Sequence, residues 1–308
     1  MEWRHKHLFD IDDWSREDIE SVLNLASEFE RRLDSKESLP SLKGRTLVNF
    51  FLESSTRTRV SFEIAAKLLG INVMNWATAS SSMAVKGESL KDTVWTLESM
   101  GVDMIVIRSS WVGAPQYIAR KARRARVINA GDGTHAHPTQ ALLDIYTAWK
   151  RFGSLEGKRV LIAGDIVQSR VARSDIIGFK KMGAYVFVSG PRNMVPLHLD
   201  ALGVSYEPDF IKAVKEADVI YLLRVQKERW KASAIPSDYE YHMNFGCREE
   251  VLKEAKPEAI VMHPGPINRG VELSSEVADG PQSLILEQVR NGVMVRTALL
   301  YLYLGGER

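Results

Sequence analysis

The chain has 308 residues, which is long enough for two domains of roughly 150 residues each. Hydrophobic residues make up 45% and charged residues 26%, a balance typical of globular proteins and unlike that of disordered chains. The 41 Lys and Arg residues nearly balance 39 Asp and Glu residues. The marked basic excess of most nucleic-acid binders is therefore missing, and we expect no nucleic-acid partner.

The sequence carries no signal for export or for a membrane. Residues 1–10 lack the apolar core of a signal peptide, and no run of about 18 apolar residues occurs. A single cysteine, Cys247, cannot form an internal disulfide. We therefore expect a cytoplasmic protein with no membrane partner.

The first half of the chain alternates short apolar runs with helical patterns. An amphipathic helix is expected over residues 15–33, with Ser15 as its N-cap. Strands are then expected at 46–52, 71–76, 103–107 and 125–129, and helices at 57–69, 90–100 and 139–150. The short runs are apolar throughout, as in parallel strands that helices cover on both faces.

Residues 152–157 form a candidate hinge, after which the alternation restarts. Strands are expected at 159–163, 184–188, 218–222 and 259–262, and helices at 174–182, 209–216 and 283–304. We predict an α/β protein with two doubly wound parallel-sheet domains, residues 1–150 and 151–282. The helix of about 283–308 is expected to pack back on the first domain, and the active site to lie in the crevice between the two.

The most informative motif follows the strand at 46–52 and reads Ser54-Ser55-Thr56-Arg57-Thr58-Arg59. A helix that begins there presents unpaired backbone N–H groups and the positive end of its dipole, which together favour an anion. Hydroxyl groups add donors, and an Arg guanidinium binds two phosphate oxygens at once. The alternative is an ordinary N-cap followed by solvated arginines, since Ser and Thr are common at helix starts.

Glycine-rich nucleotide motifs are missing from the sequence. No Walker A pattern occurs, and the segment 160–165 lacks the further glycines of a dinucleotide fingerprint. We therefore expect no nucleotide cofactor.

Several motifs, in order along nearly the whole chain, resemble the family of aspartate and ornithine carbamoyltransferases. The run Ser55-Thr56-Arg57-Thr58-Arg59 resembles the carbamoyl-phosphate signature of that family. The others are Ser82 with Lys86-Gly87-Glu88, Arg108, His137-Pro138-Thr139-Gln140, Gly164-Asp165 with Arg170, Arg224-Val225-Gln226-Lys227-Glu228-Arg229, and His263-Pro264-Gly265-Pro266. One such motif could occur by chance, but their shared order argues against chance.

Within the family, the sequence favours the aspartate branch. Ornithine-specific members usually carry a His-Cys-Leu-Pro segment and a Ser-Met-Gly motif, where this chain has His263-Pro264-Gly265-Pro266 and Arg224-Val225-Gln226. The two carboxylates of aspartate call for arginines such as Arg170 and Arg224, which would repel the cationic ornithine. Gly265 departs from the Leu or Ala usual at this position, and we expect it to loosen the turn.

The resemblance implies transfer of the carbamoyl group of carbamoyl phosphate to the amine of L-aspartate. The products are N-carbamoyl-L-aspartate and phosphate, in de novo pyrimidine (UMP) biosynthesis. Proximity and electrostatic preorganisation supply most of the acceleration in such a reaction. We therefore expect neither a metal nor a cofactor.

The resemblance also assigns the site residues. Those expected to bind carbamoyl phosphate are Ser55, Thr56, Arg57, Thr58, Ser82, Arg108, His137, Gln140, Pro264 and Gly265. Those expected to bind aspartate are Lys86, Arg170, Arg224 and Gln226. The catalytic groups are expected to be Arg57 at the leaving phosphate, Thr58, Arg108 and His137 at the carbonyl oxygen, and Lys86. Gln140 and the carbonyls of Pro264 and Gly265 are expected to hold the carbamoyl NH₂ group.

Ser82 and Lys86 lie in a segment, residues 79–87, that we expect to be a mobile loop. In the family this loop reaches the active site of a neighbouring subunit, which implies a homotrimer with shared sites. Two further partners stay open, a regulatory chain and a dihydroorotase.

Other interpretations of some of these residues remain. His135 and His137 could form a metal pair, but no third and fourth ligand follow at a recognisable spacing. His263 either serves the site or only braces the turn after it. The run Lys121, Arg123, Arg124 and Arg126 is expected to be the solvated face of a helix.

Two alternative functions remain open at this point. One is a carbamoyltransferase that uses ornithine or another amino acid as the acceptor. The other is a non-catalytic assembly partner with the same fold. Such a partner would be expected to have lost the arginines and Lys86, which this chain keeps.

Overall fold

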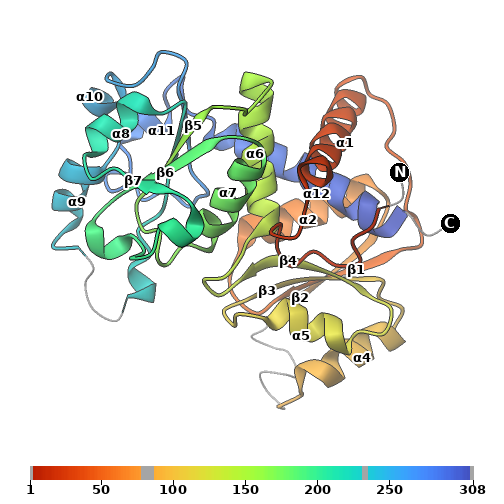
Figure 1. Ribbon diagram of the computed structural model, residues 1–308. Helices are drawn as coiled ribbons and strands as arrows, with labels where there is room; N and C mark the ends of the chain where they lie inside the picture. The colour runs from red at the N-terminus through yellow and green to blue at the C-terminus, as the bar shows by residue number, and fades with distance from the viewer. Residues whose placement is uncertain (1–2, 78–86, 231–234, 306–308) are drawn as a thin grey trace. The chain divides into compact units, whose positions relative to one another are not determined.

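The computed structural model describes residues 3–77, 87–230 and 235–305. The chain forms two compact units, which we call unit 1 (residues 1–142 and 290–308) and unit 2 (residues 143–289). Each unit contains one sheet whose strands all run parallel (Figure 1). The prediction of an α/β protein with two parallel-sheet domains is confirmed.

Unit 1 is built on a four-stranded sheet with the strand order β2-β1-β3-β4. Its elements, together with α6, which continues into unit 2, are α1 (Arg16–Asp34), β1 (Thr46–Phe51), α2 (Thr56–Leu68), β2 (Asn72–Ala77), α4 (Leu90–Ser99), β3 (Met104–Ser109), α5 (Ala114–Lys121), β4 (Arg126–Asp132) and α6 (Pro138–Phe152). Figure 1 shows α4 and α5 on one face of this sheet and α1 and α2 on the other. Both faces are thus covered, which explains why the central strands β1 and β3 are buried along most of their length.

The first helix shows how local sequence sets an element boundary. The Ser15 hydroxyl accepts from the Asp18 backbone N–H at 3.2 Å, and Asp18 Oδ2 accepts from the Ser15 N–H at 2.8 Å. This capping box fixes the start of α1 at the residue that the sequence predicts. Ile19, Val22 and Leu23 then turn the apolar face of α1 into the core.

The prediction that the charge run at residues 121–126 lies on one helix is wrong. Helix α5 ends at Lys121, and Arg126 is already the first residue of β4. Between them, the Glu98 carboxylate accepts backbone N–H bonds from Arg123, Arg124 and Ala125 at 2.8 to 3.1 Å. A buried acid from another helix therefore holds these residues in a turn, an interaction that charge spacing along the sequence does not reveal.

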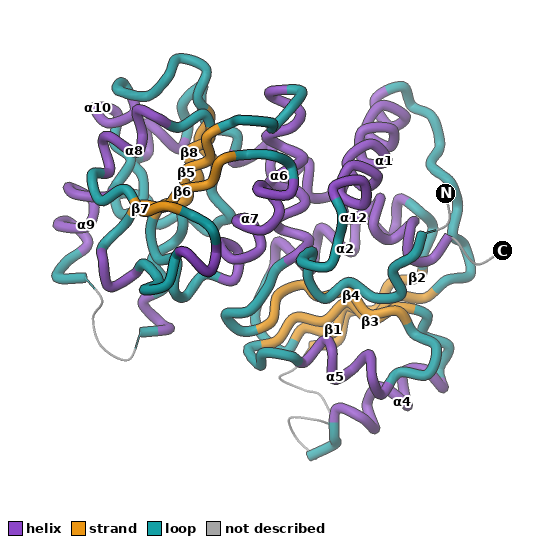
Figure 2. Tube along the Cα trace, viewed as in Figure 1, coloured by secondary structure: helices purple, strands orange, loops and turns teal. Residues whose placement is uncertain are grey.

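Unit 2 is built on a five-stranded sheet with the strand order β7-β6-β5-β8-β9 (orange in Figure 2). Its elements are β5 (Arg159–Ala163), α7 (Arg170–Lys181), β6 (Tyr185–Ser189), η2 (Arg192–Met194), η3 (Asp200–Leu202), β7 (Ser205–Tyr206), α8 (Phe210–Glu216), β8 (Val219–Leu222), η4 (Lys227–Arg229), α9 (Asp238–Phe245), α10 (Glu249–Leu252), β9 (Ile260–Met262), α11 (Ser275–Ala278) and α12 (Ile285–Gly305), the last of which continues into unit 1. Leu161, Ile220 and Val261 belong to one core cluster with the apolar side of α8. Residues between them along each strand face the opposite side of the sheet.

Helix α7 begins earlier than the sequence predicts, at Arg170 instead of residue 174. The cause is its cap, because the Ser169 hydroxyl accepts from the Ala172 N–H at 3.1 Å. This earlier start places Arg170 in the first turn of the helix.

The part of α12 that belongs to unit 1 is held there by polar contacts. Arg290 binds Asp34 at 2.9 Å, and the Tyr303 hydroxyl donates to the His7 carbonyl at 3.2 Å. Arg296, which is 4% exposed, donates to Ser61 Oγ on α2 at 2.7 Å and lies over the Phe62 ring. Residues late in the chain thus support the helix that carries the Ser/Thr/Arg motif.

Candidate active site

In unit 1, the predicted site residues come from the carboxyl ends of three neighbouring strands. The segment 55–58 follows β1, Arg108 is the second-last residue of β3, and His137 follows β4. These strands are adjacent and parallel in the order β1-β3-β4, so their carboxyl ends meet at one edge. We call this set, with Gln140, the unit 1 group.

The motif Ser55-Thr56-Arg57-Thr58 lies at the start of α2. Ser55 is the N-cap in extended conformation, yet its hydroxyl makes no capping bond, and the first turn holds no acidic residue. The N–H groups at this end therefore lack the side-chain acceptor that caps α1. An anion would satisfy them, and the helix dipole would favour it.

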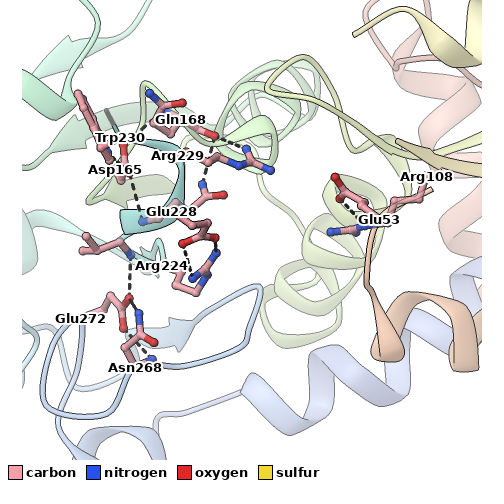
Figure 3. A network of polar contacts seen from close by, with 12 residues as sticks. Glu53, Arg108, Asp165, Gln168, Arg224, Glu228, Arg229, Trp230, Asn268 and Glu272 are labelled. Carbon is pink, nitrogen blue, oxygen red and sulfur yellow. Dashed lines mark hydrogen bonds and ion pairs between the residues drawn. The ribbon is translucent and has the colours of Figure 1, made fainter. Parts of the chain in front are cut away.

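Arg108 is held by groups on both sides of β3. Its Nε donates to Glu53 Oε1 at 2.7 Å, and its Nη1 donates to the Ala130 carbonyl at 3.3 Å. Figure 3 shows the Arg108–Glu53 pair, in which the two side chains are 15% and 21% exposed. The guanidinium is thus fixed in direction while part of it stays accessible.

His137 and Gln140 come from the start of α6. His137 is 4% exposed, and its Nε2 lies 3.4 Å from Arg108 Nη1. The Gln140 N–H donates to the His137 carbonyl at 3.0 Å in the first turn of the helix. The structure therefore brings Arg108, His137 and Gln140 to the same edge of the unit 1 sheet.

In unit 2, the predicted residues also follow three neighbouring strands. Arg170 follows β5, Arg224 and Gln226 follow β8, and the turn His263–Pro266 follows β9. The strands are adjacent and parallel in the order β5-β8-β9, so these residues gather at one edge of the sheet. We call them the unit 2 group.

The loop after β5 is packed closely against the end of β8. Gly164 has φ +118°, and a Cβ there would lie 3.1 Å from the Leu223 carbonyl oxygen and 3.0 Å from the Tyr241 hydroxyl. Both the backbone angle and this close approach require glycine. Arg170, which begins α7 after this loop, is 5% exposed.

Asp165 joins the loops after β5 and β8. Its Oδ2 accepts from Trp230 Nε1 at 2.8 Å and from the Gln226 N–H at 3.3 Å. The Gln168 carbonyl accepts from Gln226 Nε2 at 3.1 Å and from Arg229 Nη1 at 2.7 Å (Figure 3). Burial raises the pKa of Asp165 above its usual range, while these donors act in the opposite direction.

Arg224 pairs with Glu228 through both of its terminal nitrogens. Nη1 donates to Oε2 at 3.2 Å, and Nη2 contacts Oε1. A guanidinium fork facing a carboxylate is the geometry in which an arginine would bind a substrate carboxylate. The predicted role of Arg224 therefore fits its present contact.

Glu272 is the second buried carboxylate that supports the unit 2 group. It is 1% exposed and accepts from the Val225 N–H at 2.8 Å, from the Asn268 N–H at 2.9 Å and from Asn268 Nδ2 at 2.8 Å. It thereby holds the residue next to Arg224 against the segment after the His263–Pro266 turn (Figure 3). Burial raises the pKa of Glu272.

The turn after β9 is braced from within. His263 is 2% exposed, and its Nδ1 accepts from the Gly265 N–H at 2.8 Å. Gly265 has φ +61°, in the left-handed region that favours glycine. This backbone angle gives a physical reason for glycine at the position where the family more often has Leu or Ala.

Ser82 and Lys86, predicted for the shared loop, lie outside the described residues. The remaining predicted residues are described, and their roles toward ligands stay predictions. Glu53, Asp165 and Glu272 were not among the predicted site residues. The structure places Glu53 in contact with Arg108 and Asp165 in contact with Gln226, while Glu272 binds Val225, which lies between Arg224 and Gln226. For Glu53 and Asp165 a signal existed, since Glu53 directly follows a predicted strand and Asp165 is the second residue after another; Glu272 carries none.

Two further properties concern the described part of the chain. Within it, no group of three or more His, Cys, Asp or Glu side chains is arranged to hold a metal ion. None of its helices combines the length and apolar character needed to cross a bilayer.

Comparison with known proteins gives consistent matches over the whole chain. The family model described as the aspartate/ornithine carbamoyltransferase carbamoyl-P binding domain matches residues 6–150, and the Asp/Orn binding domain model matches residues 156–303. The chain is 50% identical to an aspartate carbamoyltransferase catalytic subunit of Syntrophotalea carbinolica, covering 100% of this chain and 98% of the relative. It is also 50% identical to that of Geotalea daltonii, covering 100% and 99%.

Solved structures agree with these matches. Aspartate transcarbamoylase from Trypanosoma cruzi, in complex with carbamoyl phosphate and aspartate, superposes with a TM-score of 0.87 at 30% identity over 97% of each chain. Ornithine carbamoyltransferase from Pyrococcus furiosus superposes with a TM-score of 0.87 at 30% identity over 100% of each chain. With both domain models and near-complete coverage, the chain belongs to the aspartate/ornithine carbamoyltransferase family.

Proposed function

We propose that this chain transfers the carbamoyl group of carbamoyl phosphate to the amine of L-aspartate, giving N-carbamoyl-L-aspartate and phosphate in pyrimidine synthesis. The observation that carries the choice of acceptor is the pair of arginines, Arg170 and Arg224, at the carboxyl edge of the unit 2 sheet. Fold alone does not decide it, since aspartate and ornithine enzymes superpose equally well. The curated relatives at 50% identity are named for the aspartate reaction.

The unit 1 group would bind the donor. The open N-terminus of α2, with the hydroxyls of Ser55, Thr56 and Thr58 and the guanidinium of Arg57, suits the phosphate. As the C–O bond to phosphate breaks, Arg57 would neutralise the charge that builds on the leaving oxygen. Only interactions that strengthen at this stage accelerate the step.

The carbonyl carbon becomes tetrahedral when the amine attacks, and its oxygen gains negative charge. Thr58, Arg108 and His137 would donate to this oxygen, and each such donor typically contributes about 10²–10³ in rate. Arg108 is already fixed in direction by Glu53 and the Ala130 carbonyl. Gln140 and the carbonyls of Pro264 and Gly265 would accept from and orient the carbamoyl NH₂ group.

The unit 2 group would bind the acceptor. Arg170, Arg224 and Gln226 would hold the two carboxylates of aspartate and so present its amine to the carbonyl carbon. No covalent intermediate is needed, because holding both reactants in line converts a bimolecular step into an intramolecular one.

The test is an assay with the purified full chain, carbamoyl phosphate and one acceptor at a time. We expect phosphate release and a carbamoylated product with L-aspartate, and neither with L-ornithine above the acceptor-free background. Turnover with ornithine but not with aspartate would contradict the acceptor assignment. Absence of turnover with any amine would favour the non-catalytic alternative.

We also propose a cytoplasmic homotrimer with shared sites, in which Ser82 and Lys86 would be supplied to a neighbouring subunit. Both lie outside the described residues, so this rests on the family resemblance. Mixing Lys86→Ala and Arg57→Ala subunits, each nearly inactive alone, should restore part of the activity. Properly reassembled hybrids with no recovery would count against shared sites, and native mass would show any regulatory or dihydroorotase chain bound in extracts.

A further inference from the structure

Unit 2 contains two fully buried carboxyl groups that the proposed reaction does not use. Asp144 lies on α6 and Asp175 on α7, and each is 0% exposed. Tyr221, in β8, faces them, because its neighbours Ile220 and Leu222 turn to the core on the other side of the sheet. The cluster is therefore enclosed between the sheet and helices, away from water.

Asp144 is the acceptor at the centre of this cluster. Its Oδ2 accepts from the Tyr221 hydroxyl at 2.7 Å, and its Oδ1 accepts from Gln288 Nε2 at 2.6 Å. Both donors are neutral, and such bonds to an ionised carboxylate are short and strong. The two contacts identify Asp144 as the ionised member of the pair.

Asp175 has different surroundings. The Asp144 carboxylate and the Tyr221 hydroxyl both act on it, and the single proton of that hydroxyl is already donated to Asp144. Neither oxygen of Asp175 accepts a hydrogen bond from the described residues. Burial, and then the negative charge of Asp144, raise the pKa of Asp175 well above its usual range. Two facing carboxylates in a dry interior cannot both ionise, so one proton must reside on the pair.

The cluster connects to the turn after β9 through one side chain. Gln288 is 2% exposed; while its Nε2 donates to Asp144, its Oε1 accepts from the His263 N–H at 2.9 Å. A glutamine amide has one oxygen and one NH₂ group, so an acceptor at Asp144 fixes which end faces His263. His263 in turn accepts from the Gly265 N–H. A continuous chain of hydrogen bonds thus runs from the buried pair to the His263–Pro266 turn.

We propose that Asp175 is a carboxylic acid that donates its proton to the Asp144 carboxylate, and that this pair positions the His263–Pro266 turn through Gln288. The second half rests on the proposed function, in which the carbonyls of Pro264 and Gly265 orient the carbamoyl group. Asp144, Asp175 and Gln288 are positioning residues and touch no substrate.

The first experiment compares Asp144→Asn with Asp175→Asn in the full-length protein. An amide at 175 still donates to Asp144, so we expect kcat/KM for carbamoyl phosphate within about threefold of the unchanged protein. An amide at 144 turns an NH₂ group toward Tyr221 or Gln288, so Gln288 loses its orientation and kcat/KM falls by roughly 10²-fold. An Asp175→Asn variant as impaired as Asp144→Asn would overturn the proposed proton position.

A rescue separates positioning from general loss of stability. Adding Gln288→Glu to Asp144→Asn exchanges the amide and the carboxylate, so that the new amide donates and the new carboxylate accepts from it and from the His263 N–H. We expect the double variant to regain at least about tenfold in kcat/KM. Kinetics are measured below the melting range, with the folded fraction read by circular dichroism. A folded double variant with no recovery would overturn the proposed positioning of the turn through residue 288.

The proton itself has a readout that needs no substrate. The infrared difference spectrum of the unchanged protein minus Asp175→Asn should contain the C=O stretch of a buried carboxylic acid at neutral pH. Absence of this band would overturn the proposal even if aspartate is turned over as expected. Presence of the band would support the proton on Asp175 even if the acceptor is a different amine.

If Asp144→Asn does not fold, Gln288→Met is the alternative. It keeps the Asp144–Asp175 pair and removes the hydrogen bonds that connect this pair to His263. The carboxylic-acid band should then remain while kcat/KM falls by about tenfold or more. A Gln288→Met variant with unchanged kinetics would contradict the proposed positioning of the turn.

Discussion

In unit 1, the groups proposed for the phosphate are supplied by the backbone at the start of α2 and by its side chains, of which Arg57 is exposed. In unit 2, the loops proposed for the acceptor are tied together by fully buried carboxylates, Asp165 and Glu272, each of which accepts several N–H bonds. The carboxyl edges of the two sheets thus differ: one presents an uncapped helix start, and the other presents loops held by buried carboxylates.

The difference has an energetic consequence. The N–H groups of an accessible helix end that lacks a side-chain cap bind water until an anion replaces it, so the residues of this end affect binding more than folding. A buried carboxylate that accepts backbone N–H bonds contributes to folding and to loop position at once, because removing it leaves buried donors unsatisfied. Substitutions should therefore separate stability from activity in unit 1 and couple them in unit 2.

The largest effect is expected for Arg57→Ala in unit 1. Loss of the cation at the leaving phosphate should lower kcat by about 10³-fold, while the melting temperature stays unchanged because Arg57 is exposed. Steady-state kinetics and thermal unfolding check both parts. Arg59→Ala, two residues later in the same helix, is the matched control and should retain most activity; equal losses in both variants would contradict the assignment.

Arg224→Ala should have the next largest effect, on the acceptor alone. Losing a bidentate partner for a carboxylate should raise KM for aspartate by roughly 10²-fold and leave KM for carbamoyl phosphate within about twofold. Arg269→Ala removes an exposed arginine of unit 2 that pairs with Asp279, and serves as the control. A comparable rise in KM for carbamoyl phosphate would break the division of ligands between the two groups.

Asp175→Asn tests the buried charges of unit 2 through pH. Because the pKa of Asp175 is raised in the folded state, the folded chain holds a proton that the unfolded chain loses above about pH 4. The free energy of unfolding should therefore fall as pH rises from about 4 to the raised pKa, by up to ~1.4 kcal/mol per pH unit, and then level off. The variant should lack this fall. Denaturant unfolding at a series of pH values measures it, and identical slopes in both proteins would speak against a proton on Asp175.

The smallest effects are expected for two serines at helix starts in unit 1, Ser15 and Ser55. Ser15→Ala removes a capping bond and should lower the free energy of unfolding by about 1 kcal/mol without changing kcat. Ser55→Ala removes a hydroxyl that makes no cap, so it should lower activity about tenfold but stability by less than about 0.5 kcal/mol. Finding the same stability loss in both would mean that Ser55 caps α2 after all.

The sequence predicted most strands well, because those in the middle of each sheet are short and largely buried apolar runs; β5 was predicted with its observed bounds. The short strand β7, whose Ser205 is exposed, was not predicted. Its predictions were weaker wherever a polar side chain sets the boundary. Because Ser169 caps α7, this helix begins earlier than predicted. Because the Glu98 carboxylate binds backbone N–H groups of residues 123–125, these residues form a turn where a helix was expected. Such contacts depend on which residues meet in space.

The same limit applies to the candidate site. Residues such as Arg57 and His137 stand in recognisable strings, so sequence alone could single them out. Glu272 could not be found in this way, because its function is to accept the N–H of Val225, which lies 47 positions earlier. Asp144 and Asp175 escaped for a related reason, since a buried acid looks like any other acid until its neighbours are known.

The contact between Arg296 and Ser61 has a consequence for biosynthesis. The residues of α12 that belong to unit 1, from Arg290 onward, are translated after all of unit 2. Unit 2, residues 143–289, is continuous and complete on the ribosome while α2 still lacks the guanidinium that lies over Phe62 and binds Ser61. Since domains generally fold as units, unit 1 cannot be completed when its first 142 residues emerge, and the helix with the phosphate motif gains this support only with the last residues made.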